Sequence, residues 1–147
     1  MTKTAIKYTG RPEHLNNSKT VELLKGFLKK RSDILLAFLF GSFASKQMTL
    51  YSDIDIALLF DQAPDIYGIN NLKDELTLLL KKETDIAVLN EASPILKMQV
   101  LKNGVLIFKK DKKYFNQFCA ETINQYDDLK QIRKKCEDGI LKGRIYA

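Results

Sequence analysis

The side chains with the clearest capacity for chemistry are Asp53 and Asp55, which stand two positions apart at the start of an apolar segment. Alternate residues of a strand project to the same side, so both carboxylates can point at one cation while Ile54 packs opposite. Magnesium prefers a few carboxylates and substrate phosphates to a cage built of protein alone. The pair predicts a site for a nucleotide-borne metal; a solvated strand end is the alternative, since unpaired acids are costly to bury.

A third acid, Asp85, begins a segment that repeats the pattern of the first. The run Asp85-Ile86-Ala87-Val88-Leu89 matches Asp55-Ile56-Ala57-Leu58-Leu59 in order and character. Such a repeat is expected of a neighbouring strand in a similar environment, which would present its acid beside the pair. Three acids can hold two metal ions, which stabilise the attacking and leaving oxygens of an in-line displacement.

A Gly-Ser step, Gly41-Ser42, precedes the acids, with ten residues between Ser42 and Asp53. Glycine allows the backbone to approach a phosphate, the serine hydroxyl offers a hydrogen bond, and a helix beginning at Ser42 would point its free amides at an anion. The alternative is an ordinary turn after a strand. Beside the acids, the step predicts a place for the triphosphate of a nucleotide.

The spacing of apolar residues predicts the helices and strands that position these residues. Together they form a single predicted domain that spans residues 1–147. We expect a small mixed β-sheet flanked by helices, an α/β (α+β) fold. Residues 1–17 are predicted to be loose. The predicted elements are a helix from Ser18 or Lys19, strands at Ile34–Phe40 and Ile54–Phe60, a loop from Asp61 to Gly68, a helix at Ile69–Lys82, a strand from Asp85, a helix from Pro94 to about Asn103, a strand at Val105–Phe108 and a long C-terminal helix at 111–141.

The C-terminal helix has an apolar stripe with two possible roles. Its members recur at spacings of three and four: Phe115, Phe118, Thr122, Tyr126, Leu129, Ile132 or Arg133, and Cys136. An added helix on a small sheet must bury one side, so a stripe that faces the core is the default. Docking of a partner protein is the alternative, and one helix can do both.

Composition and charge narrow the class of protein. The chain has 147 residues, 45% of them hydrophobic, and no run approaches the roughly 20 apolar residues of a membrane span. The N-terminal residues lack the apolar segment of a secretory signal, so we expect a cytoplasmic protein. Net charge is +6, with the acids concentrated around the motif. The basic run Lys109–Lys113 lacks the interleaved aromatic residues of a nucleic-acid platform, and direct nucleic-acid binding is not expected.

The spacing of Gly41-Ser42 and Asp53-Ile54-Asp55 resembles the signature of the nucleotidyltransferase superfamily related to DNA polymerase beta. Length and layout further resemble the minimal nucleotidyltransferase (MNT) antitoxins that are paired with HEPN ribonuclease toxins. The similarity runs from about Asp33 to the C-terminal helix. It includes the segment from Ser93 to Gly104 and the apolar run that follows it.

This resemblance implies the nucleotidyltransferase fold and the transfer of AMP from ATP to a hydroxyl group. The implied acceptor is a tyrosine of a cognate HEPN toxin, which is thereby neutralised. Gly41 and Ser42 would grip the phosphates. Asp53 and Asp55 would bind Mg²⁺, two ions in all, and Asp85 would complete the metal site and act in catalysis as a base. The implied substrate is ATP and the implied partner is the toxin.

One departure from the family pattern keeps alternatives open. Members often continue Gly-Ser-aromatic-Ala with Arg-Gly, whereas this chain continues with Ser45-Lys46. Lys46 can supply a positive charge to a nucleotide but not the planar fork of arginine. A non-catalytic antitoxin that acts by stoichiometric binding is therefore an alternative. A small-molecule nucleotidyltransferase of the antibiotic-modifying kind is another, although the chain is short for a substrate domain.

Overall fold

The computed structural model describes residues 12–40 and 53–141, with side chains described for residues 19–40 and 53–138. Gly41, Ser42 and Lys46 lie outside the described residues. In chain order the elements are α2 (Pro12–Lys29), β1 (Ile34–Phe40), β2 (Ile54–Phe60), α3 (Ile66–Leu80), β3 (Thr84–Val88), the short 3-10 helix η1 (Leu89–Glu91), α4 (Pro94–Asn103), β4 (Val105–Lys109) and α5 (Lys112–Leu141).

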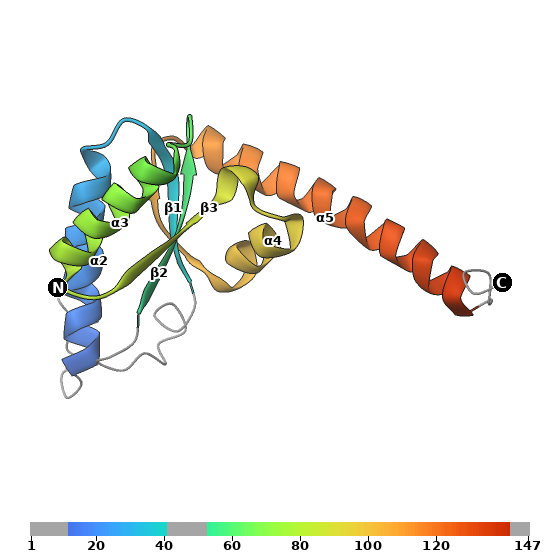
Figure 1. Ribbon diagram of the computed structural model, residues 1–147, viewed down its shortest axis with the longest axis horizontal. Coiled ribbons are helices and arrows are strands. Elements are labelled where there is room, and N and C mark those ends of the chain that lie inside the picture. Colours follow the sequence, from blue (N-terminus) through green and yellow to red (C-terminus); the bar gives the residue numbers. More distant parts are fainter. Residues whose placement is uncertain (1–11, 41–52, 142–147) are drawn as a thin grey trace.

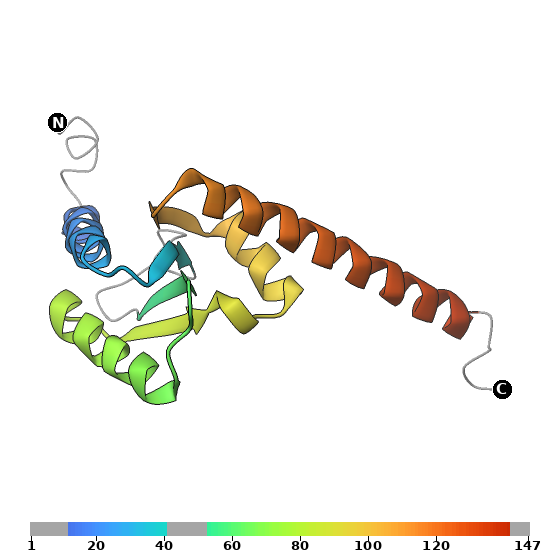
Figure 2. The ribbon, with the colours of Figure 1, turned by 90° about the horizontal axis from the view of Figure 1, so that it is seen from above.

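The four strands form one mixed sheet in the order β3-β2-β1-β4. β1 pairs antiparallel with β2 and β4, whereas β2 and β3 run parallel because α3 connects them. Helices α2 and α3 lie on one face of this sheet, and α4 and α5 lie on the other (Figures 1 and 2). The predicted mixed sheet flanked by helices is confirmed.

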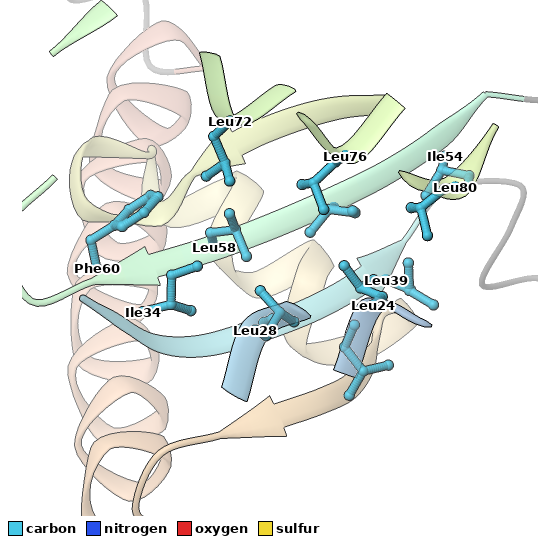
Figure 3. Close-up of a cluster of buried hydrophobic side chains, with 13 residues drawn as sticks. Leu24, Leu28, Ile34, Leu39, Ile54, Leu58, Phe60, Leu72, Leu76 and Leu80 are labelled. Atoms are coloured by element: carbon cyan, nitrogen blue, oxygen red, sulfur yellow. The ribbon is translucent and has the colours of Figure 1, made fainter. Parts of the chain in front are cut away.

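Each face of the sheet has its own apolar core. On the α2 and α3 side, alternate residues of β2 pack with leucines of the two helices, and these side chains interdigitate (Figure 3). The fully buried members are Leu24, Leu28, Ile34, Ala37, Ile54, Ile56, Leu58, Phe60, Leu72 and Leu76. The opposite face is covered by Val100 of α4 and Phe118 of α5, which pack with Leu36 and Phe38 of β1. Strands buried on both faces explain the nearly continuous apolar runs in the sequence.

Two helices begin earlier than the sequence predicted. α2 begins at Pro12, so the prediction that residues 1–17 are loose is wrong for residues 12–17. Proline suits a first helical turn because its fixed φ is helical and its missing N–H has no partner there in any case. α3 begins at Ile66, within the segment predicted as a loop, because the Asp65 carboxylate accepts a hydrogen bond from the Gly68 backbone N–H and caps the helix.

The C-terminal helix α5 is confirmed, but only part of its apolar stripe faces the core. Phe118 and Thr122 are buried, whereas Ile132 is 59% exposed and Cys136 is also exposed. Figures 1 and 2 show why: the helix crosses one end of the sheet and then extends beyond it. The default of a fully core-facing stripe is therefore wrong for the second half. No helix in the described ranges has both the length and the apolar character to cross a membrane.

Gly104, the residue between α4 and β4, allows a close approach that we expect to be essential for stability. A Cβ there would lie 2.5 Å from the Val100 carbonyl oxygen and 3.1 Å from that of Leu39. Because both atoms belong to the backbone, the clash cannot be relieved by a side-chain rotation. Gly104→Ala should lower the free energy of unfolding by about 1–3 kcal/mol, measured by urea denaturation.

Gly26 offers the matched control for this substitution. It lies inside α2, and an added Cβ would meet nothing within 4 Å. Alanine in a helix interior is favoured over glycine by about 0.5–1 kcal/mol, so Gly26→Ala should stabilise the protein. If the two variants shifted stability in the same direction, the steric explanation for Gly104 would be wrong.

Candidate active site

The register between β2 and β3 places two of the three predicted acids side by side. Asp55 pairs with Asp85 across the parallel strands, and Ile54 pairs with Thr84. The Ile54 N–H donates a 2.8 Å hydrogen bond to the Glu83 carbonyl oxygen, which ties the starts of the two strands together. The prediction that Asp85 lies on a strand next to Asp55 is confirmed, and that strand begins one residue earlier than predicted, at Thr84.

Both acids project from the same face of the sheet. Ile54 and Ile56 are fully buried in the core on the α2 and α3 side, so the intervening Asp55 points to the face that carries α4 and α5. The same alternation holds in β3, where Ile86 packs on the α3 side and Ala87 on the other. Asp53 is exposed and precedes β2 directly, two positions from Asp55. Its backbone position therefore allows its side chain to reach the same face.

The carboxyl of Asp55 is affected by the negative charges of both other acids. Partial burial raises the pKa of the Asp55 carboxyl above its ordinary value, and the negative charges of Asp85 and then Asp53 raise it further. Burial and like charges both disfavour the ionised carboxylate. A bound cation would relieve this penalty. The crowding of charge is therefore consistent with a cation site at these acids.

Lys73 is a site residue that the sequence reasoning did not find. Its Nζ lies 3.1 Å from Oδ1 of Asp85, with the two side chains 40% and 58% exposed. The hydrogen bond to Asp85, followed by the charge of that carboxylate, raises the pKa of Lys73. Lysine is one of many on the surface of this chain, and no spacing in the sequence links position 73 to position 85. The contact emerges only when α3 is packed on the sheet.

The turn between α3 and β3 fixes the position of Asp85 near the start of β3. Lys81 ends the helix in a left-handed conformation, with φ of 58°, and its N–H bonds to the Thr77 carbonyl oxygen. Thr84 is fully buried; its N–H donates to the Thr77 hydroxyl at 3.3 Å, and its own hydroxyl donates to the Lys82 carbonyl oxygen. These bonds couple the start of β3 to the last turns of α3.

The donor set suits a magnesium ion that arrives with a nucleotide. The described residues contain no preassembled group of three His, Cys, Asp or Glu side chains able to hold a metal on its own. Carboxylate oxygens are nevertheless the ligands that Mg²⁺ takes from proteins, with phosphates and water completing its octahedron. The neighbouring Asp55 and Asp85, with Asp53 beside them, fit such a shared site. Gly41, Ser42 and Lys46, predicted to contact the phosphates, fall within residues 41–52, which the structure does not describe.

Known proteins are similar to this chain in sequence and in structure. The chain is 29% identical over 131 residues to the protein adenylyltransferase MntA of Shewanella oneidensis, covering 88% of this chain and 90% of MntA. A chain of a toxin-antitoxin crystal structure with AMP-PNP superimposes with a TM-score of 0.69 and 28% identity, covering 86% of this chain and 98% of that one.

A second solved structure and a family model complete the comparison. The structure is a tri-AMPylated S. oneidensis HEPN toxin in complex with an MNT antitoxin; the match has a TM-score of 0.64 and 27% identity and covers 88% of this chain and 98% of the other. The model for polymerase beta nucleotidyltransferases matches residues 22–113, a range that contains all three acids and Lys73. The chain therefore belongs to the polymerase beta nucleotidyltransferase family.

Proposed function

We propose that this protein is an antitoxin that transfers AMP from ATP to a hydroxyl group, a tyrosine by family resemblance, of a cognate HEPN ribonuclease toxin. The observation that carries the proposal is the pairing of Asp55 with Asp85 on parallel strands, with the charge of Asp53 acting on Asp55. The similarity to MntA and to complexes that contain a HEPN toxin or AMP-PNP supports the choice of nucleotide and partner.

Asp53 and Asp55, together with Asp85, would hold the magnesium ions that this chemistry requires. Bound Mg²⁺ supplies positive charge that neutralises the phosphates and lowers the pKa of an attached hydroxyl. The chain's own contribution is to fix two carboxylates in register, with Ile54 and Ile56 buried on the other face. This buried anchoring fixes the β2 backbone at Asp55 when substrates bind.

Adenylyl transfer needs one bond to form, one to break and one proton to move. The acceptor oxygen forms a bond to the α-phosphorus of ATP, the bond from that phosphorus to the bridging oxygen of the β-phosphate breaks, and pyrophosphate leaves. Asp85 is the proposed base for the hydroxyl proton, because it lies at the exposed edge of the sheet where an acceptor can approach. Gly41, Ser42 and Lys46 are proposed to bind the triphosphate.

Mass spectrometry of the toxin tests this function directly. Purified protein, ATP, Mg²⁺ and a candidate HEPN toxin should give a toxin heavier by one or more AMP units, with the added mass on a tyrosine. Parallel reactions with GTP, CTP and UTP define the nucleotide. An unmodified toxin whose ribonuclease activity is nonetheless inhibited at equimolar ratio would show a stoichiometric binder. Full protection by an Asp53→Ala, Asp55→Ala variant would show the same in cells.

A further inference from the structure

Lys73 contacts the third acid from a different layer of the fold. α3 covers one face of the sheet, whereas Asp85 points to the other, so the lysine side chain must pass around the edge of the sheet to bring Nζ within 3.1 Å of Oδ1. This route is open because β3 is an edge strand. Asp55 lies on an inner strand, and α3 cannot reach it in this way.

The backbones at both ends of the ion pair are fixed relative to each other. Lys73 lies between Leu72 and Leu76, which are 1% and 0% exposed and anchor α3 to the sheet. One turn further along the helix, the Thr77 hydroxyl accepts a hydrogen bond from the N–H of Thr84, the residue before Asp85. The pair therefore joins two positions that the core already holds in place, which reduces the conformational entropy lost when it forms.

We propose that Lys73 is a positioning residue of the adenylyl transfer site, holding one oxygen of Asp85 and offsetting part of the charge of the three acids. This inference rests on the proposed function. By occupying Oδ1, Lys73 restricts the carboxylate to one orientation and leaves its second oxygen for the cation or the acceptor proton. Its positive charge also weakens the attraction of the acids for a divalent cation, so that cation binding depends on the arrival of the nucleotide phosphates.

This role predicts two effects of opposite sign when the charge is removed. Lys73→Gln should bind divalent cations more tightly, about 2- to 5-fold, because a neighbouring positive charge near the surface is lost. It should nevertheless transfer AMP more slowly, with kcat reduced about 10-fold and the KM for ATP little changed, because Asp85 is free to rotate. Lys73→Arg keeps the charge and should recover most of both properties.

The test compares cation binding and kinetics in the same set of variants. Binding of Mn²⁺ without nucleotide is followed by the electron paramagnetic resonance signal of the free ion, and kcat is measured by modification of the toxin at saturating Mg²⁺. Lys25→Gln is the matched control, since Lys25 is exposed on α2 and pairs with no acid in the described ranges. Circular dichroism and thermal unfolding confirm that each variant is folded.

A purely structural surface ion pair would give a different outcome. If Lys73→Gln matched Lys25→Gln in Mn²⁺ affinity and in kcat, the proposal would be overturned. A fall in Mn²⁺ affinity would overturn it as well, because it would mean that the lysine helps to assemble the cation site. Failure of the wild-type protein to modify any toxin would refute the proposed function instead, and the Mn²⁺ comparison would still decide whether Lys73 opposes cation binding.

Discussion

Asp55→Asn should reduce adenylyl transfer by about a thousandfold or more while leaving the protein folded. The substitution keeps the size of the side chain and removes the charge needed to hold the cation, and a thousandfold loss corresponds to about 4 kcal/mol of transition-state stabilisation. Rates of AMP incorporation into the toxin measure the effect. Saturating Mg²⁺ and ATP should raise the thermal midpoint of the wild-type protein but not that of the variant.

The same substitution should stabilise the cation-free protein at neutral pH. The pKa of Asp55 is raised in the folded state, so its favourable contribution is present below the unfolded pKa and is lost as pH rises through the folded pKa. Above this range the wild-type protein carries the penalty of an ionised, crowded carboxylate, whereas asparagine does not. Urea denaturation with a chelator at acidic and neutral pH should show the advantage of Asp55→Asn growing as pH rises.

Asp61→Asn is the control for both measurements. Asp61 is exposed and follows β2 at the end opposite to Asp55, so the same chemical change is made just beyond the other end of the strand. Its activity and its pH dependence of stability should match those of the wild type. Comparable losses of activity in the two variants would mean that any charge removed from β2 matters, and the assignment of Asp55 to a cation site would be wrong.

Leu76→Ala should lower the free energy of unfolding by about 2–5 kcal/mol, the largest loss of stability that we expect from a single truncation in α3. Leu76 is 0% exposed and belongs to the cluster that joins α3 to β1 and β2 (Figure 3). Truncation removes favourable apolar burial and leaves a cavity beneath the helix that carries Lys73. The midpoint of urea denaturation, with an unchanged slope, measures the loss.

Leu78, two residues further along the same helix, separates burial from helix propensity. It is 80% exposed, so Leu78→Ala removes the same atoms without creating a cavity. Alanine is at least as good a helix former as leucine, and stability should change by no more than about 0.5 kcal/mol. A loss at Leu78 as large as that at Leu76 would show that α3 is stabilised by a contact of its outer face.

The sequence was sufficient to predict the strands and the neighbouring acids because local pattern determines both. Apolar runs define β1 and β2, and the repeated order of residues after Asp55 and Asp85 reflects two parallel strands with the same environment on each face. The start of α2 was missed because the weak helix formers Asn16 and Asn17 obscured the signal from Pro12. Propensity is summed over a helix, and one favourable first residue is easily outweighed in that sum.

Other features could not be predicted because they depend on how layers pack. Lys73 reaches Asp85 around a sheet edge, and no sequence pattern links these two positions. The apolar stripe of α5 predicts which side of the helix is apolar. It does not predict how much of that side is covered by the sheet. Phe118 and Ile132 fit the same periodic pattern, yet the first is buried and the second exposed.

The length of α5 has a consequence for how the molecule moves. Its first half is clamped by β1 and α4 through residues such as Phe118, whereas the half beyond Tyr126 is supported chiefly by its own backbone hydrogen bonds. Isolated helical segments shorter than about 12–15 residues are marginal in water. Amide hydrogens should therefore exchange with solvent progressively faster toward Leu141, so that one continuous helix joins a rigid root to a tip that repeatedly unwinds and re-forms.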